Sequence, residues 1–474
     1  MGVLFRIPGF TRTRIRIALA FIVVLSAAVV ADAAVNDRST VPGEAAPDST
    51  PAENATAPPT ENHTVVTESG RAGTITAHDP DGEVIYHNDS RTKYFDVDPV
   101  EGEPMTVEYT ASDTIHSEGP TCSDPPCVRN VIERTNLSTG EVEVVYERYD
   151  YTENAGEWHD ADRIDDDRYL VADIIDDQVF VVDTETGVVE WLWDAQADYP
   201  LESGHAFPRD WLHINDVEYI EEGEMAGTIM ISPRNLDQVI FVDPDEGVIE
   251  DWTLGEEHDE DVLYAQHNPD YIPEDRGGPA VLVADSENDR IVEYQREDGE
   301  WNQTWEWSDE RADWPRDADR LPNGNTLITD SHGERVVEVD ESGDVVWQTE
   351  FDHPYEAERL ETGDESEGGR SAAELDLESH TPAEDDGGES EAAGGDGGFV
   401  SSSGETLVER VESALPQHLE AALLAATPSW IGATEAAALA AGLLSGLLWI
   451  GLEVAWRLRD AGVTVRSPVA RERE

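Results

Sequence analysis

Three histidines recur along this chain at a fixed interval. His159, His213 and His267 follow one another at steps of 54 residues, and a fourth related segment has Arg316 at the corresponding position. An imidazole can bind a metal, donate a hydrogen bond or act as a nucleophile near neutral pH. A guanidinium offers a planar fork of donors to the oxygens of sulfate or phosphate. Brought together, these four side chains would form either a metal site or a site that binds an oxyanion.

The segments that these four residues open share one pattern. Each contains four short apolar runs divided by turn residues, as in HDADRIDDDRYLVADIIDDQVFVVDTETGVVEWLW, which begins at His159. A repeat of about 50 residues with four such runs is typical of one blade of a β-propeller. Equivalent positions of successive blades face a shared central axis. The sequence therefore predicts an all-β propeller of about six four-stranded blades, within residues 71–352, in which the four side chains converge.

A structural role for the histidines is the first alternative. In some propellers a histidine pairs with an acid and braces a turn, and Asp160, Asp216 and Asp270 closely follow the three histidines. The fourth segment has no histidine at this position, which a bracing role would not readily tolerate. The pattern therefore favours a functional role.

A second arginine departs from the repeat. Three segments place an aspartate after their second strand, whereas the segment of His213 has Pro233 followed by Arg234. Those aspartates are Asp173, Asp285 and Asp330. A guanidinium beside a metal ion is unfavourable, and we find no acidic ligand in register with the repeat. We therefore expect no metal site and no cofactor, and we favour an oxyanion site built on Arg234 and the histidines.

Several motifs resemble those of one known family. DWLHIND (210–216), ISPRN (231–235), AQHNPD (265–270) and the LPNGN and ITD runs of the last blade look like the aryl-sulfate sulfotransferase family. The resemblance implies a six-bladed propeller that moves a sulfuryl group from a phenolic sulfate ester to a phenolic acceptor through a histidine. It also implies that His267 is the nucleophile and that the sulfate oxygens and the leaving phenolate are bound by His213, Asn215, Arg234 and His159. We add Arg316 to the substrate-binding residues, and we expect His332, outside the repeat position, to contribute little.

Two other functions remain open at this point. The propeller could be a cell-surface module that binds an anionic or glycan ligand, or a protein partner, without turnover. It could also be a quinone-cofactor dehydrogenase, because those enzymes are tryptophan-rich propellers too. We find no calcium-ligand set tied to the repeat, which disfavours the dehydrogenase.

The net charge of −75 is extreme for 474 residues, and Lys93 is the only lysine. Such a balance is typical of proteins adapted to high salt, where screening removes the repulsion between carboxylates. A melting temperature that does not depend on salt would contradict this halophilic interpretation. The charge also argues against a nucleic-acid partner.

The ends of the chain carry features of a membrane protein. Basic residues followed by an apolar run and an A-x-A site predict a signal peptide or an uncleaved signal anchor. A second apolar run, followed by arginines, predicts a transmembrane helix with its C-terminus in the cytoplasm and the propeller outside the cell. The predicted parts are a signal segment (1–34), a Thr/Pro-rich linker (35–70), the propeller (71–352), an acidic disordered tether (353–403), an amphipathic juxtamembrane segment (404–430), the transmembrane helix (436–456) and a basic cytoplasmic tail (457–474).

The sequence also contains a cysteine pair, a GxxxG motif and several glycosylation sequons. Cys122 and Cys127 are spaced like a disulfide-closed loop in an exported protein, with two unpaired thiols as the alternative. Gly442 and Gly446 form a GxxxG motif, through which two copies could pair as a homodimer. Sequons for N-glycosylation occur at Asn54, Asn62, Asn88, Asn136 and Asn302.

Overall fold

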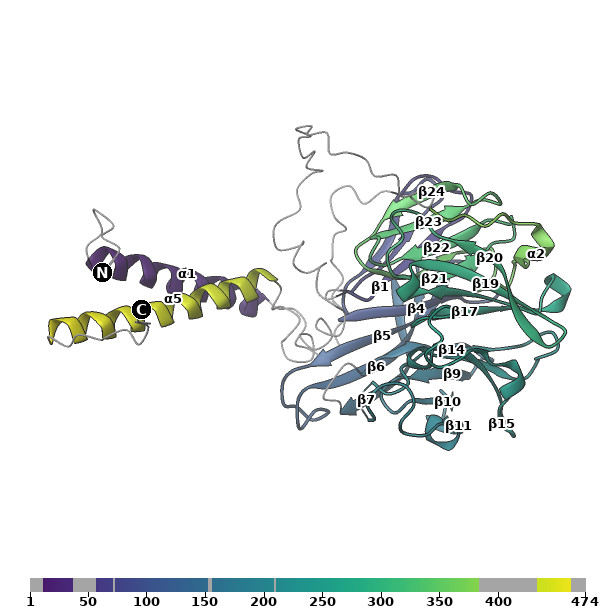
Figure 1. Ribbon diagram of the computed structural model, residues 1–474, viewed down its shortest axis with the longest axis horizontal. Helices are drawn as coiled ribbons and strands as arrows, with labels where there is room; N and C mark the ends of the chain where they lie inside the picture. The colour runs from purple at the N-terminus through teal and green to yellow at the C-terminus, as the bar shows by residue number, and fades with distance from the viewer. Residues whose placement is uncertain are drawn as a thin grey trace, which may run out of the picture. The chain divides into compact units, whose positions relative to one another are not determined.

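The strands form a six-bladed β-propeller (Figure 1), as the sequence predicts. The computed structural model describes residues 12–36, 57–70, 73–151, 156–208, 210–382 and 433–461. They fall into two compact units, of which one contains the propeller and the other contains two helices. Each blade is an antiparallel sheet of four strands, and blade 4 carries an additional short strand.

The six blades follow the chain in order. Blade 1 contains β1 (Thr64–Glu68), β2 (Ile75–His78), β3 (Val84–Asn88) and β25 (Pro354–Arg359); blade 2 contains β4 (Lys93–Pro99), β5 (Thr106–Ile115), β6 (Cys127–Asn136) and β7 (Glu141–Tyr151); blade 3 contains β8 (Trp158–Asp160), β9 (Arg168–Asp173), β10 (Gln178–Asp183) and β11 (Val188–Asp194). Blade 4 contains β12 (Ile214–Tyr219), β13 (Ile229–Pro233), β14 (Gln238–Asp243), β15 (Gly247–Val248) and β16 (Leu254–Gly255); blade 5 contains β17 (His267–Ile272), β18 (Ala280–Asp285), β19 (Arg290–Glu297) and β20 (Glu300–Trp307); blade 6 contains β21 (Pro315–Arg320), β22 (Thr326–Asp330), β23 (Arg335–Val339) and β24 (Val345–Glu350). Short helices in the connections are η1 (Ala195–Ala197), η2 (Arg234–Leu236), η3 (Glu250–Trp252), η4 (Glu274–Arg276), η5 (Ser286–Asn288) and α2 (Ala372–Leu375).

Apolar faces and turn residues account for these sheets. Between blades 5 and 6, for example, Leu282 and Trp305 belong to the same buried cluster as Ile328. The outer hairpin of blade 5 turns at Asp298 and Gly299, whose φ angles are 52° and 88°. Two successive positive φ angles match the twist that a two-residue hairpin loop requires. The D-G pair at 298–299, read as a turn in the sequence, therefore forms this hairpin loop.

The ring closes with strands from both ends of the propeller. β25 pairs with β1, and Val66 lies opposite Ala357. Both strands lie outside the predicted range 71–352, because β1 falls in the predicted linker and β25 falls in the predicted acidic tether. The acidic composition after residue 352 is typical of a solvated segment, but Glu356 and Glu358 are buried in the closing strand. The rest of the tether beyond residue 382 and the juxtamembrane segment 404–430 lie outside the described residues.

Acidic side chains join neighbouring blades at the axis. The innermost strands β4, β8, β12, β17, β21 and β25 contact one another in a ring. Their inner edges have no further strand to pair with, so the backbone N–H groups there need other acceptors. A carboxylate of one blade accepts an N–H of the next blade at every junction: Glu356 from Val97, Asp96 from Ala161, Asp160 from Val217, Glu218 from Tyr271, Asp317 from Ala357, and Asp270 from Arg320 through the hydroxyl of Ser366. We call these six carboxylates the acidic ring.

The acidic ring corrects one expectation from the sequence, because acids do recur in register with the repeat. It also bears on the alternative that acids brace the histidines: Asp160 accepts a backbone N–H and Asp270 accepts from Ser366, so these two acids have partners other than an imidazole. The acids of the innermost strands therefore serve ring closure.

The helical unit contains α1 (Arg12–Asn36) and α5 (Ala433–Asp460), and α5 includes the predicted transmembrane helix. Both helices are long and apolar enough to cross a membrane, a test that a signal sequence also passes. They lie side by side in opposite directions (Figure 1). Two ion pairs connect them, Arg12 with Asp460 and Arg16 with Glu453.

The remaining sequence features can be placed individually. Cys122 and Cys127 are joined by a disulfide with an S–S distance of 2.03 Å, in the connection between β5 and β6. Among the sequons, Asn302 is exposed on β20, whereas Asn62, Asn88 and Asn136 are half-buried, and Asn54 lies outside the described residues. Gly442 approaches Ser26 of α1 within the same chain.

Candidate functional site

Three aspartates fix the loops that carry the functional side chains. Asp177, Asp237 and Asp289 lie in the turns between the second and third strands of blades 3, 4 and 5, each with a positive φ. Each carboxylate accepts a backbone N–H from the loop that leads into the next blade: Asp177 from His213 at 2.8 Å, Asp237 from Ala265 at 3.1 Å, and Asp289 from Trp314 at 3.0 Å. Each blade therefore positions the start of the innermost strand of its neighbour.

His159 and His213 lie next to each other. Their ring centroids are 5.2 Å apart and the rings are nearly perpendicular. His159 also contacts Phe95 of β4 at 4.6 Å and Tyr355 of β25 at 5.7 Å. The Nδ1 atom of His159 is buried and has no hydrogen-bond partner among the described residues. A buried polar atom of this kind is available to a bound ligand.

His213 lies between an acidic side chain and an arginine. Its Nδ1 atom is hydrogen-bonded to the carboxylate of Asp210, and its Nε2 atom lies 3.5 Å from Nη1 of Arg234. Because a carboxylate accepts and a guanidinium donates, Nδ1 carries the proton and Nε2 has a lone pair directed toward Arg234. Arg234 follows β13 at the start of η2, and its Nε atom has no partner within the described ranges. The arginine that departs from the repeat thus contacts the histidine of its own blade.

The contacts of His267 favour one tautomer. Its side chain is buried, and its Nδ1 atom lies 3.1 Å from the carbonyl oxygen of Ala265 and 2.8 Å from Oγ of Ser286. A carbonyl oxygen can only accept, so the contact with Ala265 favours a proton on Nδ1. Nε2 is then the unprotonated nitrogen, and it is the atom of this ring that can attack an electrophile.

Trp314 connects the second arginine to the histidines. The ring of Trp314 lies 5.0 Å from that of His267, and the guanidinium of Arg316 lies 4.8 Å above the indole. Arg316 also donates from Nη1 to Oγ of Ser69 at 2.6 Å. His332 stacks on Trp314 at 5.0 Å, so it belongs to the wall of the pocket despite its place outside the repeat position.

Asn215 supports the backbone beside His267. It is fully buried in β12, and its Nδ2 atom donates to the carbonyl oxygen of Gln266 at 2.9 Å. The side-chain Nε2 atom of Gln266 in turn donates to Oγ of Ser232 at 3.1 Å. Asn215 therefore orients the segment that carries His267, and its Oδ1 atom has no hydrogen-bond partner among the described residues.

The electrostatics keep the imidazoles neutral in a positive environment. Burial lowers the pKa of His267 well below its usual range, and the charges of Arg234, Arg316 and the two other histidines lower it further. Burial likewise lowers the pKa of His159. Desolvation opposes ionisation of Asp210, but His213, His205 and Arg234 outweigh it and lower the pKa of that carboxyl.

The structure thus brings together His159, His213, His267, Arg234 and Arg316, which we call the histidine pocket. Two guanidinium groups can bind an oxyanion, and the lone pair of His267 can form a covalent bond to it. Sequence reasoning missed several side chains of the site: Phe95, Asp210, Ser286, Trp314 and Tyr355. Two of them could have been found, because Asp210 and Trp314 lie in the loops that immediately precede an innermost strand.

Comparisons with known proteins agree with this architecture. Residues 149–352, less than half of the chain, match the sequence model of the arylsulfotransferase (ASST) family. No curated protein matches the chain.

Solved structures with a related arrangement share little sequence with it. A Bacteroides caccae protein of unknown function has 13% identity and a TM-score of 0.44, over 63% of this chain and 98% of its own. The Pseudomonas aeruginosa periplasmic gluconolactonase PpgL has 11% identity and a TM-score of 0.40, over 63% and 98%. Saccharomyces cerevisiae Sqt1 has 10% identity and a TM-score of 0.35, over 60% and 71%. Nothing about the activity of this chain follows from these likenesses.

The pocket geometry predicts that inorganic sulfate binds and that Arg234→Met weakens binding about tenfold or more, because a hydrogen bond to a charged group contributes about 1.5–3 kcal/mol. Trp314 provides the readout, through tryptophan fluorescence during a sulfate titration at constant ionic strength. Arg168→Met is the matched control, since Arg168 is an exposed arginine paired with Asp165. Equal affinities for wild type and Arg234→Met would refute the oxyanion site.

Proposed function

We propose that this chain is a membrane-anchored aryl-sulfate sulfotransferase, which moves a sulfuryl group from a phenolic sulfate ester to a phenolic acceptor through His267. The observation that carries the proposal is the hydrogen bond from Nδ1 of His267 to a backbone carbonyl, which leaves Nε2 unprotonated in a pocket with two arginines. The match of residues 149–352 to the arylsulfotransferase family supports the same reaction class.

In the first half-reaction the donor ester is cleaved. The lone pair on Nε2 of His267 forms a bond to sulfur, and the bond between sulfur and the phenolic oxygen breaks with its electrons on the phenolate. Charge spreads over the peripheral oxygens in such a loose transition state, as in phosphoryl transfer. Arg234 and Arg316 are placed to stabilise that charge, and preorganised donors of this kind supply most of the catalysis in related reactions.

In the second half-reaction the acceptor takes the group. The oxygen of the phenol bonds to sulfur, the N–S bond breaks, and its electrons return to Nε2 of His267. Nε2 of His213 takes the phenolic proton, and Asp210 stabilises the imidazolium that forms. In the next cycle His213 returns this proton to the leaving phenolate, so protons balance over the whole ping-pong reaction.

Aromatic side chains support an aryl substrate. Trp314 contacts His267, while Phe95 and Tyr355 contact His159. Their rings offer apolar surface and edge or face contacts to a phenyl group near the reacting imidazoles. This composition is compatible with an ester of a phenol.

Replacement of His267 tests the function. With a nitrophenyl sulfate as donor and a phenol as acceptor, His267→Ala should abolish both the first-turnover burst of nitrophenolate and steady-state transfer. His213→Ala should retain the burst, because nitrophenolate leaves without a proton, but should slow steady-state transfer by about 10²–10⁴-fold. His258→Ala, with its exposed side chain, is the control and should match wild type.

If His267→Ala is active, or if His213→Ala shows no burst, the assignment of His267 as nucleophile and of His213 as proton acceptor is wrong. Absence of turnover in wild type with any aryl sulfate would favour a binding module at the cell surface.

We further propose that α1 is retained as a second membrane anchor beside α5, with both chain ends in the cytoplasm and the propeller outside. The pairs Arg12–Asp460 and Arg16–Glu453 support this arrangement, since charged side chains in or near a membrane are stabilised by a partner. The arginines that follow α5 support the same orientation.

A single specific cleavage tests this topology. A recognition site for a sequence-specific protease, inserted after Gly398, should be cut by protease added outside intact cells. The propeller should then stay with the membrane, because α1 still anchors it. Release of the propeller into the medium would mean that the N-terminal segment is removed, and protection from the protease would mean that the orientation is inverted.

A further inference from the structure

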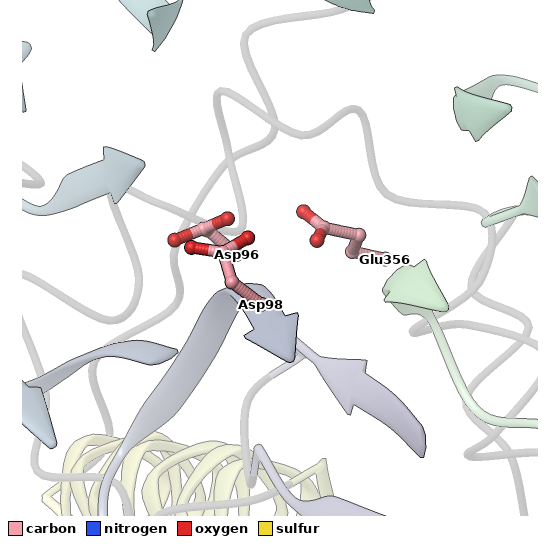
Figure 2. Close-up of side chains that lie close together, drawn as sticks. All are labelled: Asp96, Asp98 and Glu356. Carbon is pink, nitrogen blue, oxygen red and sulfur yellow. The ribbon is translucent and has the colours of Figure 1, made fainter. Parts of the chain in front are cut away.

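The axis of the propeller carries a second concentration of polar groups, apart from the histidine pocket. Asp96 and Asp98 of β4 and Glu356 of β25 are buried, and one oxygen from each lies within 4.8 Å of the others. Figure 2 shows the three carboxyl groups extending from their strands toward a common space. We call these three residues the axial cluster.

The axial cluster is surrounded by further acids, and no ion pair joins it to a basic side chain among the described residues. Burial and the charges of Asp364, Asp96 and other carboxylates raise the pKa of Asp98 well above its ordinary value. The charged neighbours that shift the pKa of Asp96 and of Glu356 are also all acids. Two arginines that lie on the same side of the propeller have other acceptors: Arg320 pairs with Glu293 at 3.0 Å, and Arg276 donates to the backbone of Ser366 at 2.8 Å.

Buried oxygens without a hydrogen-bond partner also occur on the innermost strands around the axial cluster, on acids other than its three members. Both carboxylate oxygens of Asp319 are buried with no hydrogen-bond partner in the part of the chain that the structure describes, and its side chain is only 1% exposed. Asp216 and Glu358 each have one such oxygen, on the same set of innermost strands. Buried polar atoms in native proteins are nearly always satisfied, by protein, water or an ion.

The hydrogen bonds leave room for a ligand within the axial cluster. One oxygen of Asp96 accepts from Ala161, and Glu356 accepts from Val97 and from Asn268. Each carboxylate has about four lone-pair positions, so these contacts orient the groups without using up their capacity. A cavity of about 1160 Å³ leads to one of the three ligands, because Asp98 lines it together with Asp160, Asp162, Glu218, Asp270 and Asp364.

We propose that Asp96, Asp98 and Glu356 bind a calcium ion on the axis of the propeller. An all-oxygen ligand set favours a hard cation over zinc, copper or iron. Calcium bonds to oxygens at about 2.3–2.6 Å, so oxygens up to 4.8 Å apart can share one ion, and it accepts irregular geometry better than magnesium. We expected no metal site from the sequence, because the acids of the innermost strands were not recognised as part of the repeat.

Calcium at this position would also affect the histidine pocket. Asn268 donates from Nδ2 to Oε2 of Glu356 at 3.1 Å, and it follows His267 directly in β17. The ion would fix Glu356, which would then hold Asn268 and the start of β17. It would act as a structural ion, with no direct part in group transfer.

Equilibrium dialysis of the full-length protein in detergent tests the site. The protein is first stripped with a chelator, then dialysed against radiolabelled calcium in molar potassium chloride, which screens weak binding to the acidic surface. Wild type should bind one calcium more per chain than Asp98→Asn, or bind that ion at least tenfold more tightly. Asp285→Asn is the matched control, because Asp285 is equally buried but pairs with Arg290 at 2.6 Å.

The wild-type measurement decides the proposal even if a variant fails to fold. No saturable calcium binding by wild type would overturn it, as would equal binding by wild type, Asp98→Asn and Asp285→Asn. Saturation by magnesium or potassium in place of calcium would also overturn it. Calcium should in addition raise the melting temperature of stripped wild type, and Asp98→Asn should lose this rise.

Discussion

Six sheets arranged around an axis leave the inner edge of each sheet without a strand to pair with, and this constraint organises the propeller. Backbone N–H groups on those edges are buried and must find acceptors. Carboxylates supply them directly at five junctions, for example Glu356 to Val97 between blades 1 and 2, and at the sixth Asp270 acts through the hydroxyl of Ser366. Each acid therefore connects two blades and sets their relative height. Burying so many carboxylates costs free energy, and a cation bound at the axis would reduce that cost.

The same innermost strands determine the histidine pocket. His159 and Asp160 are adjacent in β8, so the junction that holds Asp160 also holds the imidazole. Near the histidine pocket, turn aspartates such as Asp177 accept backbone N–H groups and so fix the loops that lead into the next blade. The result is a pair of guanidinium groups and three imidazoles that are positioned by the backbone of neighbouring blades. Such positioning is what electrostatic catalysis requires, because the donors need not reorganise during the reaction.

Much of the fold and part of the site could be predicted from the sequence. The spacing of the histidines predicted both the blades and the convergence, because equivalent repeat positions must face one axis. The closing strand β25 was missed, since an acidic segment such as YEAER is indistinguishable by composition from a solvated one. The acids of the innermost strands were read singly, as candidates to brace histidines, and not as a ring. The place of Asp210 and Trp314, just before an innermost strand, could have marked them as candidates, but the direction of their side chains depends on a loop conformation with a positive φ at both residues.

The central claim is that a sulfuryl group resides on His267 between donor and acceptor. The most direct test is a reaction of the full-length protein with a radiolabelled aryl sulfate, without acceptor, followed by an alkaline quench and peptide mapping. The account predicts one label per chain on the peptide that contains Gln266 and His267, which disappears when a phenol is added before the quench. A label on the peptide of His213, or continued turnover with no labelled peptide at all, would contradict it.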